Sequence, residues 1–205
     1  MKIIAHRGKR SVAVENSLQA IKAALEDNHI YGVEIDVRES LDKEFVVIHD
    51  SFISRVTDGR GMVKSMTFKE LEKFGIPRLK DVLNIKTNKL LLLELKDIKM
   101  DVKSFAKLVN RYDKKNIYVM SFYSELIHKL IGEKANVRVG VLNYVFNSEK
   151  NYDEYDFIGL LESVVSLNIF DYFKERNIEV FVYGFTSKKL DDVLWIERVY
   201  SIIDV

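Results

Sequence analysis

Acidic, basic and histidine side chains gather where short apolar runs of this sequence end. The first three such runs are Ile3–Ala5, Val33–Val37 and Leu90–Leu95. Residues i and i+2 of a strand point to the same face, so two carboxylates spaced in this way converge if their run is a strand. The groups at these ends that could do chemistry are His6, Arg7, Glu34, Asp36, Glu94 and Lys96.

A histidine is brought to the same place by a predicted hairpin. The apolar run Phe45–Ile48 follows the second run after only a few residues, which are too few for a crossover between parallel strands. We therefore expect an antiparallel pair. A turn at Asp42-Lys43 pairs residues whose numbers sum to about 85, which sets His49 opposite Asp36.

Three carboxylates at close range repel one another unless something neutralises them. Glu34, Asp36 and Glu94 therefore predict a divalent cation. The chain has no Cys, and oxygen ligands of this kind favour Mg²⁺ or Ca²⁺ over Zn²⁺. One such ion is the expected cofactor.

The remaining groups at these ends complete a site for phosphate chemistry. His6 and His49 form a plausible acid–base pair, because histidine is the side chain most suited to proton transfer near neutral pH. Arg7 and Lys96 add two positive charges. Together with three carboxylates and a divalent cation they give a net charge of about +1, which suits a singly charged phosphodiester.

The elements that must position these groups alternate along the chain. Several of the apolar runs are apolar nearly throughout, as parallel strands buried on both faces are. Eight strands with helices between them predict an α/β fold of the (β/α)₈ TIM-barrel type, in which the carboxyl ends of the strands form the site. An open doubly wound sheet is the alternative fold. Besides the three runs named above, the strands expected are Ile117–Met120, Val137–Leu142, Phe157–Leu161, Val180–Tyr183 and Ser201–Ile203.

Amphipathic stretches between the runs predict the helices. One begins near Asn16, where Asn or Ser can cap and four apolar residues from Leu18 to Leu25 form one stripe. We expect the chain to be a single domain, 1–205, with the hairpin and a short helical insertion at 39–86, including one helix at Thr67–Phe74. The other helices expected are Val102–Tyr112, Ser124–Ile131, Ile169–Asn177 and Lys188–Glu197.

Composition limits the classes of function. The 205 residues carry 32 Lys and Arg against 31 Asp and Glu, a net charge of +1, which argues against a nucleic-acid partner. No apolar run approaches the roughly 20 residues that span a bilayer, and no signal peptide is recognisable. We therefore expect a cytoplasmic protein that does not insert into membranes, with a small-molecule phosphodiester as its partner.

Five short motifs follow one another along the chain: His6-Arg7-Gly8, Glu15-Asn16-Ser17, Glu34-Ile35-Asp36-Val37, Val47-Ile48-His49-Asp50 and Glu94-Leu95-Lys96. At these motifs the sequence resembles the glycerophosphodiester phosphodiesterases, of the PLC-like phosphodiesterase superfamily. The resemblance covers nearly the whole chain and implies a PLC-like barrel with a divalent metal. It implies that Glu34, Asp36 and Glu94 are metal ligands, that His6 and His49 are catalytic, and that Arg7 and Lys96 bind the substrate phosphate.

Two further carboxylates lie within these motifs. We expect Glu15 to orient Arg7 or the metal site. Asp50 is expected either to orient a histidine or to cap the turn that follows it.

Two departures from the family pattern bear on the substrate and the hairpin. Tyr183 stands where a Trp is frequent, and the turn Leu41–Glu44 lacks the usual Gly.

The expected reaction is metal-dependent hydrolysis of a glycerophosphodiester to an alcohol and glycerol 3-phosphate, by attack of water or of the substrate's own 2-hydroxyl. One alternative is a lysophospholipase D or sphingomyelinase D-like activity on an acylated lipid. Another is a non-catalytic barrel that binds a phosphorylated ligand.

Overall fold

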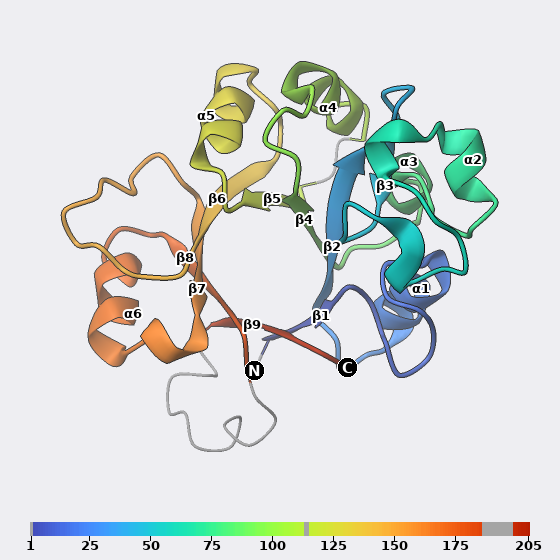
Figure 1. Ribbon diagram of the computed structural model, residues 1–205. Helices are drawn as coiled ribbons and strands as arrows, with labels where there is room; N and C mark the ends of the chain where they lie inside the picture. Colours follow the sequence, from blue (N-terminus) through green and yellow to red (C-terminus); the bar gives the residue numbers. More distant parts are fainter. Residues whose placement is uncertain (1, 113–114, 186–198) are drawn as a thin grey trace.

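Eight parallel strands close into a barrel in the computed structural model, which describes residues 2–112, 115–185 and 199–205 (Figure 1). The strands pair in the order β1, β9, β8, β7, β6, β5, β4, β2, and β2 pairs again with β1. This closure confirms the predicted barrel and excludes the open doubly wound sheet. The strands are β1 (Lys2–His6), β2 (Gly32–Glu39), β4 (Leu90–Leu95), β5 (Ile117–Ser121), β6 (Arg138–Asn143), β7 (Phe157–Leu161), β8 (Glu179–Tyr183) and β9 (Tyr200–Ile203).

Helices lie around the outside of the barrel (Figure 1). Helix α1 begins after Ser17, whose hydroxyl accepts from the amide of Ala20 at 3.2 Å, as expected of an N-cap. The helices on the outside are α1 (Leu18–Glu26), α3 (Leu79–Leu83), α4 (Val102–Val109), α5 (Ser124–Gly132) and α6 (Leu167–Lys174). Helices α4, α5 and α6 start and end within a few residues of the predicted bounds, whereas α3 lies in the insertion, where no helix with these bounds was predicted. The helix expected at Lys188–Glu197 lies outside the described residues.

The strands are apolar on both faces because both faces are covered. One apolar cluster fills the space between barrel and helices, and a second fills the barrel itself around Leu92, Phe157 and Phe181. Gly140 makes room for this inner layer. A Cβ at Gly140 would lie 2.5 Å from the carbonyl oxygen of Phe157 and 2.6 Å from its ring. The packed interior leaves the strand ends as the place for a site.

The predicted hairpin is present, but its predicted register is wrong by one residue. Strand β3 (Phe45–Val47) pairs antiparallel with β2, and Val37 lies opposite Val47, so partner numbers sum to 84. The amide of Ile48 donates to the carbonyl of Asp36 at 3.0 Å, so Ile48, rather than His49, lies across from Asp36.

The turn of this hairpin explains the shift. The backbone amide of Ser40 donates to the carbonyl of Glu44 at 2.9 Å, which leaves a loop of three residues, centred on Asp42. A loop of three residues, in place of the predicted two-residue turn, changes the sum of the paired residue numbers from 85 to 84. Lys43 has φ +67°, the left-handed conformation that Gly adopts without steric cost.

The segment after β3 forms an insertion built from short helical pieces: η1 (Ile53–Arg55), η2 (Val63–Ser65) and α2 (Phe68–Glu72). These are more pieces than the one or two helices expected, and α2 covers the middle of the predicted Thr67–Phe74. The apolar side chains of this segment pack on one another as a cluster of their own, here called the insertion cluster. Its buried members are Val46, Ile48, Ile53, Val63, Phe68, Leu71 and Ile76.

A search for membrane-spanning helices among the described residues finds none with the necessary length and apolarity.

Candidate active site

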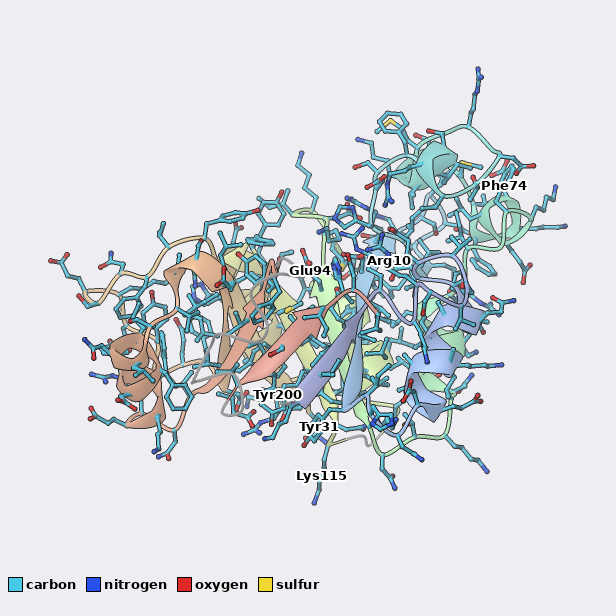
Figure 2. The ribbon with its side chains drawn as sticks, turned by 90° about the horizontal axis from the view of Figure 1, so that it is seen from below. Arg10, Tyr31, Phe74, Glu94, Lys115 and Tyr200 are labelled. Atoms are coloured by element: carbon cyan, nitrogen blue, oxygen red, sulfur yellow. The ribbon has the colours of Figure 1, made fainter. Side chains whose placement is uncertain are left out.

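The carboxyl ends of the strands surround a cavity of about 630 Å³, here called the barrel mouth. Figure 2 shows Glu94 and Arg10 at this end of the strands and Tyr31 and Tyr200 at the other. Six of the seven side chains expected to meet line the cavity, and the seventh, Asp36, is buried beside them. The six are His6, Arg7, Glu34, His49, Glu94 and Lys96.

The three carboxylates converge at the base of the barrel mouth. Glu34, Asp36 and Glu94 each place an oxygen within 4.8 Å of the others. The exposed fractions of these residues are only 1%, 1% and 8%. Burial, followed by repulsion from Asp36, raises the pKa of Glu34 well above its ordinary value, and the same two causes raise the pKa of Glu94.

Two oxygens of this trio have no hydrogen-bond donor among the described residues: Oε1 of Glu34 and Oδ1 of Asp36. Asp36 Oδ1 has only the ammonium of Lys96 at 3.5 Å. Buried oxygens that lack donors cost free energy, and a cation bound between them removes both this cost and the repulsion. The trio therefore fits a divalent cation with oxygen ligands.

Two cationic side chains reach into the trio. The ammonium of Lys96 lies 2.7 Å from Glu94 Oε1. Nε of Arg7 lies 3.3 Å from Asp36 Oδ2, and the Arg7 amide donates to Glu34 Oε2 at 3.0 Å. Each cation is thus held over the carboxylates and presented to the cavity.

The turn after β1 explains why Arg7 can make these contacts. Arg7 has φ +58° and Gly8 has φ +87°, so the chain reverses within two residues. A Cβ at Gly8 would lie 2.7 Å from the carbonyl carbon of Ala20, which restricts this position to glycine. Backbone conformations of this cost are found at functional sites.

Asn16 is a site residue that we did not recognise from the sequence, where it was only a possible cap. It is buried with φ +59°. Its side-chain amide donates to Asp36 Oδ2 at 2.9 Å, and its oxygen accepts from the Asp36 amide at 3.2 Å. Asn tolerates this left-handed conformation, so the residue type suits both tasks. Its position in the Glu15-Asn16-Ser17 motif was the available signal.

The two histidines meet the barrel mouth from different elements, and each has a carboxylate at Nδ1. His6 Nδ1 lies 2.8 Å from Asp204 Oδ1, and its Nε2 accepts from Arg7 Nε at 3.1 Å. Burial, and next the charge of Arg7, lower the pKa of His6. His49 Nδ1 lies 2.6 Å from Asp50 Oδ1.

Arg38 was also missed, although the strand period predicts its place. It follows Glu34 and Asp36 on the same face of β2. Its Nε donates to the carbonyl of His49 at 2.8 Å, and it pairs with Asp97. Arg38 therefore holds the backbone that carries His49.

Glu15 and Asp50 lie directly behind the cations and histidines. Glu15 Oε1 accepts from Arg7 Nη1 at 2.9 Å. Burial opposes ionisation of Glu15, but hydrogen bonds from Arg55 and Arg7 lower its pKa to about 2. Asp50 contacts His49, and a hydrogen bond from Arg55 is the main reason that the pKa of Asp50 falls to about 2.

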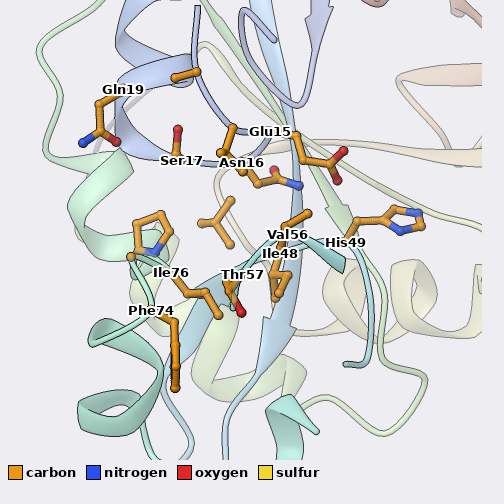
Figure 3. A pocket seen from close by; sticks show the side chains of 15 residues that line it. Glu15, Asn16, Ser17, Gln19, Ile48, His49, Val56, Thr57, Phe74 and Ile76 are labelled. Atoms are coloured by element: carbon orange, nitrogen blue, oxygen red, sulfur yellow. The ribbon is translucent and has the colours of Figure 1, made fainter. Parts of the chain in front are cut away.

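A second pocket, of about 390 Å³, adjoins the barrel mouth (Figure 3). It lies between the loop before α1 and the insertion, and Glu15 and His49 stand at one side of it. Its other walls are mostly apolar, with Ile48, Phe74 and Ile76 among them.

One wall of the barrel mouth is aromatic. The rings of Phe122 and Tyr144 stack with centroids 4.6 Å apart, and Tyr183 meets Phe122 edge-on at 5.8 Å. These rings lie across the cavity from the charged groups contributed by β1 and β2. The barrel mouth therefore offers a charged half and an apolar half.

Residues 6–201 match the model of the glycerophosphoryl diester phosphodiesterase family. The chain belongs to this family. All five motifs from which the resemblance was drawn lie inside the matched region. The family assignment rests on almost the whole chain, and the resemblance stated from the sequence is confirmed.

Individual relatives agree with this assignment. Glycerophosphodiester phosphodiesterase 1 of Bos taurus is 30% identical over 165 residues, covering 68% of this chain and 48% of that protein. A glycerophosphodiester phosphodiesterase of Caldanaerobacter subterraneus is 42% identical over 71 residues, covering 35% of this chain and 29% of that protein. The chain thus matches less than half the length of these relatives.

The solved structures add the fold. A phosphodiesterase from Oleispira antarctica, in complex with the product sn-glycerol-3-phosphate, superposes with a TM-score of 0.84 and 21% identity. The match covers 100% of this chain and 92% of that chain. This similarity shows that the barrel architecture is shared.

Proposed function

We propose that this protein is a metal-dependent glycerophosphodiester phosphodiesterase that releases an alcohol and glycerol 3-phosphate. The observation that carries the proposal is the convergence of three buried carboxylates, two histidines and two cations at one barrel mouth. The family assignment supports it. So does the product named for the Oleispira antarctica structure.

In this proposal Glu34, Asp36 and Glu94 hold one divalent cation, Mg²⁺ or Ca²⁺. When bound, the ion supplies Lewis-acid stabilisation of charge on the phosphoryl oxygens. The orphaned oxygens of Glu34 and Asp36 are the structural reason to place it there.

The other residues bind the phosphate and move protons. Arg7 and Lys96 bind the phosphate oxygens and stabilise the charge that develops on them. One histidine of the pair His6 and His49 takes the proton of the attacking hydroxyl, and the other donates a proton to the leaving alcohol. Glu15 orients Arg7, and Asp50 orients His49.

The test is a substrate panel with chelator, Mg²⁺ and Ca²⁺, read by ³¹P NMR of the phosphate product. We expect glycerol 3-phosphate from glycerophosphodiesters only when a divalent cation is present. A transient cyclic phosphate would identify attack by the 2-hydroxyl. Tight binding of a phosphodiester without turnover in any metal would contradict the proposal and support the non-catalytic barrel.

A second substrate class is favoured by the apolar half of the barrel mouth. The aromatic wall of Phe122, Tyr144 and Tyr183 offers contact area beyond what a deacylated headgroup uses. We propose acylated lysophospholipids as this second class, cleaved by the same groups. Matched substrates with and without the acyl chain test it, and a lower KM for the acylated member is the expected result.

We also propose that residues 1–205 act as one catalytic domain, with 39–86 as the hairpin and insertion inside it. Limited proteolysis tests this proposal. A single protected fragment is expected, because the hairpin strand β3 is paired with the barrel strand β2.

A further inference from the structure

Both histidines at the barrel mouth are held at the same ring nitrogen. Nδ1 of His49 faces Asp50 and Nδ1 of His6 faces Asp204, at 2.6 and 2.8 Å. A carboxylate at Nδ1 keeps the proton on that nitrogen of a neutral imidazole. For His49, Nε2 is then the nitrogen left to exchange a proton with a substrate, whereas Nε2 of His6 accepts from Arg7 Nε at 3.1 Å.

Each of these carboxylates is in turn held by an arginine. Arg55 Nε donates to Asp50 Oδ2, the oxygen that His49 does not use. Arg10 Nη1 lies 2.5 Å from Asp204 Oδ1. Each histidine thus begins a series of contacts, here called an arm, that runs from histidine to aspartate to arginine.

The two arms meet at one carboxylate, Glu15. Arg55 binds it in a bidentate manner, with Nη2 at 2.6 Å from Oε1 and Nη1 at 3.0 Å from Oε2. Arg10 Nη2 lies 3.9 Å from Oε2, a looser contact. Bidentate arginine–carboxylate pairs fix orientation as well as charge. The Arg55 arm is therefore the better defined of the two.

Arg55 joins parts of the chain that are distant in sequence. It ends η1 in the insertion, whereas Glu15 lies in the loop between β1 and α1. The side chain of Glu15 is only 7% exposed, while that of Arg55 is 45% exposed. A buried carboxylate thus anchors a half-exposed arginine. Arg55 contacts one oxygen of Asp50, and His49 contacts the other.

We propose that Arg55 is a positioning residue that holds His49 in its productive orientation and tautomer through Asp50, with Glu15 as its anchor. The inference rests on the proposed function, because it assumes that His49 transfers a proton. Without Arg55, Asp50 keeps one contact, so its carboxylate rotates and the Nδ1 proton of His49 is no longer fixed. A mere structural tie between insertion and loop would leave the state of His49 unchanged.

The test uses Arg55→Met and Arg55→Lys, with Arg60→Met as a matched control. Arg60 is another exposed arginine of the same insertion. The first readout is the side-chain ¹⁵N spectrum of the histidines in chelator, with the His49 signals assigned from His49→Ala. It reports the tautomer without any turnover, so it remains informative if the phosphodiesterase activity itself is absent.

We expect Arg55→Met to shift His49 away from the Nδ1–H tautomer and to lower kcat by about 10–100-fold with little change in KM, the size typical of supporting partners. Arg55→Lys should restore part of both effects, because its single ammonium can still reach Asp50. A normal His49 spectrum in both variants would overturn the proposal, and so would a lowered thermal midpoint as the only change. If Arg55→Met does not fold, the spectrum of Arg55→Lys decides.

Discussion

The two ends of the barrel differ in how far their charged groups are paired. At the amino end, Glu179 accepts from Tyr200 at 2.9 Å and from Arg138 at 3.0 Å. Arg138 also donates to Tyr118, and Lys2 donates to Tyr200 at 3.3 Å. At the carboxyl end, three carboxylates share two cations, and two of their oxygens lack a donor. Figure 2 shows Tyr200 and Glu94 at these opposite ends.

The same strands contribute to both ends, so the difference lies in which residue types begin and end each strand. Strand β1 begins with Lys2 and ends with His6, and β8 begins with Glu179 and ends with Tyr183. At the amino end the carboxylates of Glu179 and Asp156 both have donors, and the Phe181 and Tyr200 rings stack 4.3 Å apart. Stability is therefore gained at the amino end, and the carboxyl end keeps unsatisfied groups for a ligand.

The largest effect is expected from Glu34→Gln. Because Glu34 is a proposed metal ligand, turnover with metal should fall more than about 10³-fold, since Lewis-acid stabilisation is worth several kcal/mol. Stability in chelator should rise instead. The pKa of Glu34 is raised in the folded state, so its ionisation lowers stability as pH rises above the unfolded value near 4.5.

Thermal unfolding in chelator at pH 5 and pH 8 checks this expectation. The midpoint of Glu34→Gln should exceed that of the wild type, and the difference should be larger at pH 8. Glu125→Gln, which changes an exposed carboxylate on α5, serves as the control. If Glu34→Gln were less stable than the wild type at pH 8, repulsion among the three carboxylates would not destabilise the metal-free barrel.

His6→Ala and His49→Ala should each lower the rate by about 10²–10⁴-fold on a substrate with a poor leaving alcohol, the usual worth of a positioned acid or base. A p-nitrophenyl ester needs little protonation of its leaving group. It should rescue only the variant that lacks the acid, and His29→Ala, an exposed position, should have no effect on either substrate. Near wild-type rates in either alanine variant would remove that histidine from the mechanism.

At the opposite end, Tyr200→Phe should lower stability without lowering kcat. The change removes the hydrogen bond to Glu179 and the longer one from Lys2. The bond to Glu179 is worth about 1 kcal/mol, or roughly 2–4 °C in thermal midpoint for a chain of this size. Tyr31→Phe is the matched control at the same end, since Tyr31 is 46% exposed. Loss of activity in Tyr200→Phe at a temperature where it is folded would show that the two ends are coupled.

The last prediction compares Glu15, whose pKa is lowered, with Glu34, whose pKa is raised, within the carboxyl end. The pKa of Glu15 is lowered to about 2, so its contribution to stability is complete above the unfolded value near 4.5 and is lost as pH falls toward 2. Denaturant titrations between pH 6 and pH 3 should show the gap between wild type and Glu15→Gln narrowing with acid. A constant gap would indicate that Glu15 contributes through packing alone.

The strands and the place of the site could be predicted from the sequence, because strands that are buried on both faces consist of continuous apolar runs. The register of the hairpin could not. Phe45, Val46, Val47 and Ile48 are all buried, so alternation carries no information about which residues lie opposite β2. Only the length of the loop sets that register, and Lys43 adopts the left-handed conformation without the glycine that would have indicated it.

Three residues that support the site, Arg38, Asn16 and Arg55, were harder to predict. Arg38 could have been found from the two-residue period of β2, and Asn16 from its motif. Arg55 could not, because it lies in an irregular, half-exposed segment where neither periodicity nor burial marks it. Its importance comes from contacts with Glu15 and Asp50, which only the tertiary structure reveals.

The insertion cluster has a consequence for how this protein loses activity on heating. Its seven buried side chains pack together apart from the two clusters of the barrel. Small clusters of this kind open as separate cooperative units, at a lower free energy than global unfolding. Because His49 and Arg55 are carried by this part of the chain, inactivation should precede melting of the barrel, and amide hydrogens of residues 51–76 should exchange before those of β4 and β5.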